Sequence, residues 1–213
     1  MKQTAIIGIV IAIVVVVIIA AVALSGSHAP SGTGGNTSSS STPTTTGNQS
    51  SGSQYTQVMS KSTAGALTGY SGSNATYNVT YMNASKAQAA LNGGAAPPGV
   101  VANITGEWVM RYGGVGANVG IFQITIGSKA PQALYDAALD SAAHNGEKFN
   151  VTNATADGMT YSYISNSTNI SNSTVHSLIL LGYKGGYATF VTLAGNATAT
   201  PQTVVADLAA GLS

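Results

Sequence analysis

One group of side chains in the sequence has types and spacing that suit a metal ion. Asp136, Asp140 and His144 follow one another at intervals of four residues, so on a helix they would line one face. Two carboxylates and an imidazole can bind a divalent metal. The same spacing is typical of the solvated side of a helix, and Leu134 and Leu139 supply an apolar side that would pack on a sheet. We expect a solvated helix face and keep the three residues as metal-ligand candidates.

Other kinds of catalytic site find little support. A serine nucleophile needs a positioned base. His144 and His176 are the histidines of the predicted domain, and neither accompanies a G-x-S-x-G motif. The glycine-rich run 113–116 precedes a predicted strand, whereas a phosphate-binding loop opens a helix. We therefore expect a non-catalytic protein without a cofactor.

Six aromatic residues are candidates for a binding surface. A flat aromatic face can stack on a sugar or contact a partner, but aromatic residues of strands more often fill the core or pair across strands. We expect core packing for most of them. They are Trp108, Tyr112, Tyr161, Tyr163, Tyr183 and Tyr187.

The strongest pattern concerns asparagine. The chain has 15 asparagines, and 12 of them stand in N-x-S/T with x not proline, the acceptor motif for N-linked glycans. If Ser and Thr filled about a quarter of positions at random, roughly four such motifs would arise. A surface rich in Asn, Ser and Thr is the alternative explanation. We expect the acceptors to be exposed, with the cluster at 166–172 marking a surface loop. They are Asn36, Asn48, Asn74, Asn78, Asn83, Asn103, Asn150, Asn153, Asn166, Asn169, Asn172 and Asn196.

An N-terminal apolar segment would place these motifs outside the cell. Residues 5–24 carry no charge, and twenty residues of helix span about 30 Å, the thickness of a bilayer core. Lys2 lies in the segment 1–4, and positive charge favours the cytoplasmic side. We predict a cytoplasmic stub at 1–4, a transmembrane signal-anchor at 5–24 and an extracellular remainder. A cleaved signal peptide ending near residues 21–23 is the alternative.

The segment after the anchor predicts a disordered linker. Residues 25–54 consist almost wholly of Ser, Thr, Gly, Asn and Pro, so they cannot bury enough apolar area to offset the entropy of ordering. Their composition around Pro43 is similar to that of O-glycosylated stalks. The remaining residues, 55–213, suffice for one domain of ordinary size.

Charge and cysteine content narrow the classes of function. Charged residues make up 6% of the chain and the net charge is +1, against a typical charged fraction of about 25%. No nucleic-acid surface is therefore expected. Solubility must come from another source, either attached glycan or an acidic exterior in which carboxylates are neutral. The chain has no cysteine, so packing alone must hold the domain together.

The domain itself predicts an α+β fold. Tyr112 and Tyr183 each begin a similar stretch, with a Gly-Gly turn, a strand containing phenylalanine and an alanine-rich helix that starts at proline. This suggests two β-β-α units sharing one antiparallel sheet of five or more strands, with two helices packed on one face. Strands are expected at 77–82, 100–104, 107–112, 119–126, 149–152, 159–164, 175–183 and 187–193, and helices at 86–91, 131–144 and 201–211.

Anchor, stalk, dense acceptor motifs, few charges and absent cysteine together resemble archaeal membrane-anchored cell-surface glycoproteins. The resemblance is to a class of proteins, and it is carried by the first 55 residues and by the density of motifs. It implies a non-catalytic ectodomain for envelope association, adhesion or binding of a partner or ligand. The partners would be the membrane, through residues 5–24, and other surface-layer or envelope proteins.

Two alternatives stay open at this point. A type IV pilin-like filament subunit would use the apolar N-terminal helix, but the usual peptidase site after Lys2 and a glutamate near the helix start are lacking. A membrane-tethered extracellular enzyme or solute-binding protein is the other. The oligomeric state does not follow from the sequence.

Overall fold

The computed structural model describes most of the predicted domain. The predicted stub 1–4, anchor 5–24 and linker 25–54 lie outside the described residues. Within the described part of the chain, no helix is both long enough and apolar enough to cross a bilayer. The described ranges are 56–71, 74–91, 98–114, 119–170, 173–195 and 199–212.

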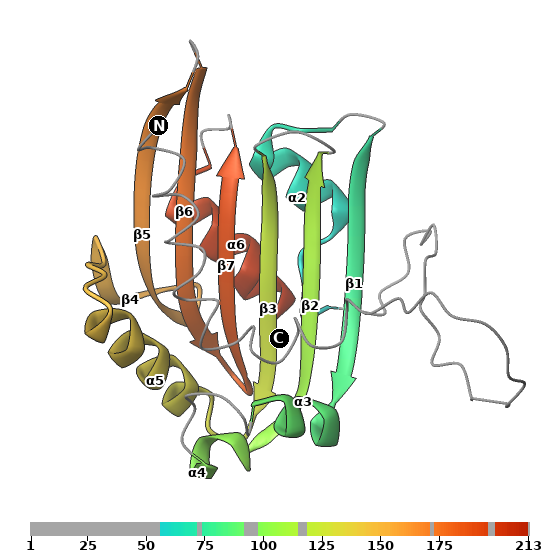
Figure 1. Ribbon diagram of the computed structural model, residues 1–213, viewed down its shortest axis with the longest axis vertical. Coiled ribbons are helices and arrows are strands. Elements are labelled where there is room, and N and C mark those ends of the chain that lie inside the picture. Colours follow the sequence, from blue (N-terminus) through green and yellow to red (C-terminus); the bar gives the residue numbers. More distant parts are fainter. Residues whose placement is uncertain are drawn as a thin grey trace, which may run out of the picture.

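A single antiparallel sheet of seven strands forms the centre of the domain (Figure 1). The strand order is β1-β2-β3-β7-β6-β5-β4, so β1 and β4 are the two edges. The α+β class and the antiparallel sheet are thus confirmed. The bounds are β1 Ala75–Asn83, β2 Ile104–Gly114, β3 Gly120–Ser128, β4 Val151–Ala156, β5 Met159–Ile170, β6 Ser173–Lys184 and β7 Tyr187–Gly195.

Two tight hairpins fix the register of β4 with β5 and of β6 with β7. Asp157 and Gly158 connect β4 to β5 and both have positive φ, 52° and 74°, as a type I′ turn requires. Gly185 begins the two-residue connection between β6 and β7 with a φ of 55°, which suits a type II′ turn. The second hairpin was predicted from its Gly-Gly pair.

Five helices of the described ranges cover the sheet on both faces. Helices α2 and α6 lie behind the strands in Figure 1, and α5 crosses the opposite side at the lower left, with α3 and α4 below it. The bounds are α2 Lys61–Thr68, α3 Ala84–Leu91, α4 Pro98–Val101, α5 Pro131–His144 and α6 Pro201–Gly211.

The prediction that two helices pack on one face is wrong. Leu208 of α6 belongs to one apolar cluster with Leu180 of β6. Leu134 of α5 belongs to the other cluster, with Leu181. Successive residues of a strand point to opposite faces, and β6 is apolar at Leu178 and at the three residues that follow. Both faces of the sheet are therefore apolar, and each needs a cover.

This arrangement also limits the suggested duplication. The order of elements recurs, because the hairpins β2–β3 and β6–β7 are each followed by a helix. Strands β3 and β7 pair antiparallel, so a two-fold axis between them would run perpendicular to the sheet and leave both helices on one face. Since α5 and α6 lie on opposite faces, the units repeat along the chain but not in space.

Three further segments differ from the prediction. Helix α2 was not predicted; Ser60 caps its N-terminus by accepting from the Thr63 amide, and Gly69 ends it with a φ of 67°. The segment expected as a strand at 100–104 starts with the short helix α4. The cluster expected as a loop lies mostly in β5, which runs through Asn166 and Asn169.

Candidate functional site

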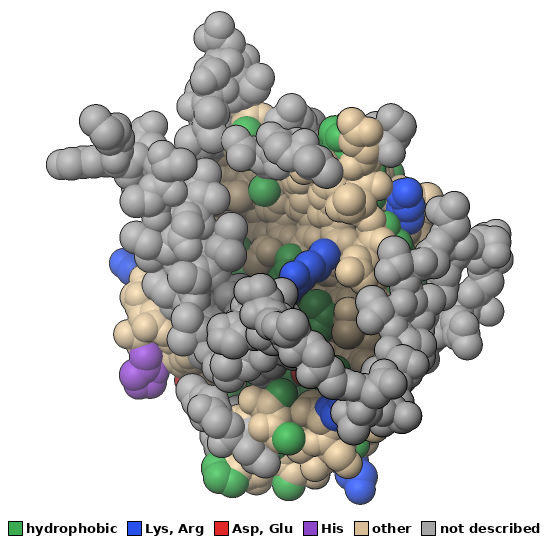
Figure 2. Space-filling view, turned by 45° about the vertical axis from the view of Figure 1, so that its right-hand side comes forward, with side chains coloured by type: hydrophobic (Ala, Val, Ile, Leu, Met, Phe, Trp, Pro, Cys, Tyr) green, Lys and Arg blue, Asp and Glu red, His purple; other side chains and the backbone are tan. Residues whose placement is uncertain are grey.

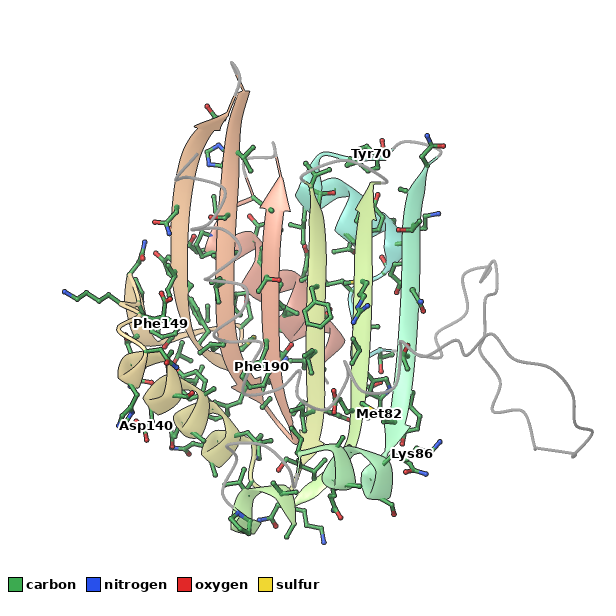
Figure 3. All side chains as sticks on the ribbon, in the orientation of Figure 1. Tyr70, Met82, Lys86, Asp140, Phe149 and Phe190 are labelled. Atoms are coloured by element: carbon green, nitrogen blue, oxygen red, sulfur yellow. The ribbon has the colours of Figure 1, made fainter. Side chains whose placement is uncertain are left out.

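The metal-ligand candidates line the outer side of α5. Asp136, Asp140 and His144 are all exposed, and Figure 3 shows Asp140 on the side of α5 turned away from the sheet. The His144 ring contacts the main chain, with Nδ1 2.6 Å from the Asp140 carbonyl oxygen. Among the described residues no group of three or more His, Cys, Asp or Glu side chains is placed to hold a metal. The geometry is that of a solvated helix face.

A serine–histidine contact occurs elsewhere in the sheet. Ser167 Oγ lies 2.8 Å from His176 Nδ1, and the two residues are directly opposite each other on β5 and β6. A nucleophilic site also needs a group that orients the base and donors for the oxyanion. Within the described part of the chain no hydrogen bond orients the other ring nitrogen of His176. The contact therefore has the form of a cross-strand hydrogen bond.

The predicted aromatic candidates mostly pack inside the fold. Tyr112 and Tyr161 are buried, and the other four are half-buried. Tyr183 contacts Tyr135 of α5, with ring centroids 5.2 Å apart, and Tyr161 stacks on Tyr163. Core packing and same-face pairing thus account for these residues.

One aromatic row reaches the surface. Trp108 of β2 lies between Tyr81 of β1 and Tyr187 of β7, with centroid distances of 5.0 and 6.0 Å. Tyr81 is 48% exposed and was not among the predicted candidates, although its place in an edge strand would have allowed it. A Cβ at Gly106 would lie 3.1 Å from the Tyr81 ring, so glycine leaves room for this ring. The exposed end of the row is a flat apolar face that a sugar or partner could contact.

The glycan acceptor motifs lie on the outside of the domain. Of the seven acceptors whose side chains are described, Asn103 is half-buried and the other six are exposed. Those six are Asn74, Asn78, Asn83, Asn150, Asn153 and Asn166. Asn169 lies in β5, while Asn36, Asn48, Asn172 and Asn196 lie outside the described residues.

Hydrogen bonds near each acceptor asparagine determine whether its side-chain Nδ2 is available for glycan attachment. An N-linked glycan is attached to Nδ2 of asparagine. Asn83 and Asn153 use Oδ1 instead, accepting from the Lys86 amide at 3.1 Å and from the Tyr135 hydroxyl at 2.9 Å. No hydrogen bond within the described residues engages the side chain of Asn78. These three acceptors therefore present a free Nδ2.

A buried acid is the most unusual group in the fold. Glu107 of β2 is 0% exposed, and neither carboxyl oxygen has a hydrogen-bond partner within the described residues. It faces the same side as Val109, beneath the apolar cluster that includes Leu91 of α3. Burial raises the pKa of the Glu107 carboxyl to about 7, because the charged form loses its hydration. Its strand neighbours are Met82 and Ile126, and this pairing, which no local sequence pattern gives, accounts for its burial.

The surface carries few charges. On the described part of the face in Figure 2, the Lys and Arg side chains stand apart from one another among hydrophobic, uncharged and backbone atoms, and little Asp or Glu is visible. Arg111 lies over the ring of Phe122, 5.3 Å from its centroid.

No family model, no curated protein and no solved structure matches the chain. The functional assignment therefore depends on the sequence pattern and the geometry.

Proposed function

We propose that this chain is a single-pass cell-surface glycoprotein whose α+β ectodomain is non-catalytic. Its role would be envelope association, adhesion or binding of a partner or ligand. The observation that carries the proposal is the exposure of six of the seven acceptor asparagines whose side chains are described. Acceptors must be reachable by the transferring enzyme, and these are.

The scarcity of charge supports the same proposal. With 6% charged residues, the domain lacks the charge that keeps most soluble domains dispersed. Glycans on the exposed acceptors would supply a hydrophilic layer in its place. Where Figure 2 is not grey, its charged side chains are few and stand apart, which is compatible with such a layer.

The proposed anchor and partners follow from the apolar segment 5–24. It would hold the chain in the membrane with its N-terminus inside, and the linker 25–54 would separate the ectodomain from the lipid. Other surface-layer or envelope proteins are the proposed neighbours, and the exposed end of the aromatic row at Tyr81 is the apolar contact available to them. The archaeal origin rests on the class resemblance alone.

Protease treatment of intact cells tests this proposal. Proteinase K is the suitable enzyme, because no Lys or Arg occurs between Lys2 and Lys61 and trypsin cannot cut the linker. We expect the chain to resist alkaline carbonate extraction from membranes, and we expect its ectodomain to be removed from intact cells. Cells opened before treatment serve as the control. A protease-protected chain in the cytosolic fraction would disprove the proposal.

A further inference from the structure

The sheet has open edges along β1, along β4 and along the part of β5 that continues beyond Tyr163. Among the described residues, strand β1 pairs with β2 alone, through nine residue pairs in regular register. In the same part of the chain strand β4 pairs with β5 alone, and this pairing ends at Tyr163. Beyond that point β5 continues to Ile170 and pairs with β6 alone within the described residues. An unpaired edge exposes backbone N–H and C=O groups that can pair with another chain.

The usual protection of open edges is missing in β1 and only partly present in β4. Proteins commonly place charged residues or proline in edge strands, shorten them or interrupt them with bulges. Strand β1 has the sequence ATYNVTYMN and β4 has VTNATA, so neither contains a charge or a proline. The register shift between Val151 and Ala154 interrupts β4. Strand β1 has no such irregularity.

The glycan acceptors are concentrated on these edges. Eight acceptors fall within the described residues, and seven of them lie in an edge segment or directly before its first residue. Strands β2, β3, β6 and β7, which have a neighbour on each side, contain none. The eighth acceptor, Asn103, lies between α4 and β2. The seven are Asn74, Asn78 and Asn83 at β1, Asn150 and Asn153 at β4, and Asn166 and Asn169 in the outer part of β5.

We propose that the glycans cap the open edges of the sheet and prevent a second copy of this chain from pairing with it strand to strand. This inference rests on the proposed function, because it requires that the acceptors carry glycan. A docking strand would lie about 4.8 Å from β1. Asn78 is at the middle of β1, exposed and with a free Nδ2, so a sugar chain there would occupy that approach. Asn153 lies at the register shift of β4 with a φ of 56°, and its side chain is also exposed with a free Nδ2.

The excluded partner is a second copy because anchoring brings copies together. Chains held in one membrane by residues 5–24 would present the same edge at the same height above the lipid. Strand β1 is also apolar on one side, where Tyr77 and Val79 pack on the core. Two bare β1 edges could therefore form a continuous antiparallel sheet across two molecules.

Removal of single acceptor motifs tests the proposal in the full chain, produced in a host that transfers N-linked glycans and purified in a mild detergent. Thr80→Ala and Thr155→Ala together abolish the motifs of Asn78 and Asn153 but keep both asparagines. Thr80→Ser and Thr155→Ser together keep the motifs and form the matched control. Thr105→Ala abolishes the motif of Asn103, away from the edges, and controls for glycan loss in general.

Light scattering gives the particle mass, and infrared absorption of the amide I band detects intermolecular strand pairing. We expect at least about a doubling of mass, with new intermolecular β-sheet, for the double alanine variant. The serine variant and Thr105→Ala should keep the mass of the parent. Replacing both alanines of the double variant by lysine, as Thr80→Lys and Thr155→Lys, should restore that mass, because a lysine in each strand protects its edge. If the glycans served only to assist folding, the lysine substitutions would not restore the parent's mass.

The outcomes separate this inference from the proposed function. A double alanine variant that is folded by circular dichroism, has lost both glycans and keeps the parent's mass overturns the inference alone. Glycan found on other acceptors of the parent but on none of the seven edge acceptors does the same. If the parent carries no glycan at any acceptor, the proposed function and the inference both fail.

Discussion

At the scale of single residues, Glu107 makes the free energy of unfolding depend on pH. Its carboxyl has no hydrogen-bond partner among the described residues and is fully buried, so the neutral form is favoured in the folded protein. The pKa is raised by burial from 4.5 to about 7. Arg111, the next cation along the same strand, is exposed and contacts Phe122 instead. The raised pKa therefore reflects loss of hydration without compensation by a cation.

The sign of the pH effect follows from which state binds the proton. Below pH 4.5 the carboxyl is neutral in both states, and Glu107 causes no loss of stability. As the pH rises from 4.5 to 7, the unfolded chain loses the proton first, so the free energy of unfolding falls. Above pH 7 the folded form is charged too, and the loss is complete at roughly 3 kcal/mol. Glu107 thus contributes greater stability in acid, which agrees with an acidic exterior as one explanation for the few charges.

Glu107→Gln tests this effect, because glutamine has the same shape and no charge. We expect the unfolding free energy of the parent to fall by roughly 3 kcal/mol between pH 4.5 and 8, and that of Glu107→Gln to lose most of this dependence. Urea titrations of the full chain in mild detergent, followed by circular dichroism, measure it. Glu147→Gln, on a half-buried side chain outside the core, is the control. Parallel pH curves for the parent and Glu107→Gln would contradict the account.

At the scale of elements, the hairpin between β4 and β5 depends on one glycine. Gly158 has a φ of 74°, a conformation that costs an L-residue about 1–2 kcal/mol. Gly158→Ala should lower the unfolding free energy by that amount. Gly99→Ala is the matched control, because no atom lies within 4 Å of the added Cβ in α4; it should be neutral or slightly stabilising. Equal unfolding midpoints for the two variants would show that the turn is not as described.

The elements also show how far the sequence could predict this fold. Long periodic segments were predicted well: α5 and α6 begin at Pro131 and Pro201 as expected, and the β6–β7 hairpin forms around its Gly-Gly pair. The second covered face was missed, because the apolar run of β6 was not taken as a sign of burial on both sides. Helix α2 was missed because alanine, glycine and threonine give little helical pattern.

For the candidate site, the sequence predicts where the acceptor motifs lie along the chain but not how they are arranged on the sheet. The acceptor motifs are local in sequence, so their positions were known from the sequence alone. Their concentration on the sheet edges depends on strand order, which brings β1 and β4 to the two ends. The aromatic row depends on register as well, because Tyr81, Trp108 and Tyr187 come from three separate strands. Such pairing between distant segments is not contained in any local pattern.

At the scale of the whole molecule, the proposed glycosylation would explain both the low charge and the dense acceptor motifs. A domain with 6% charged residues and two uncharged edge strands would associate readily if it were bare. Glycan on the exposed acceptors would address both features together, by hydrating the surface and by blocking the edges. The proposed function and the proposed protection of the edges therefore both depend on attached sugar.

Site-resolved mass spectrometry of the chain from native membranes tests this claim most directly. Peptides that carry the β1 and β4 acceptors, released with and without enzymatic or chemical removal of glycan, report the occupancy of each site. The account predicts sugar on Asn78 and Asn153, whose side-chain nitrogens are free. Unmodified asparagine at every one of the 12 acceptor motifs would contradict it.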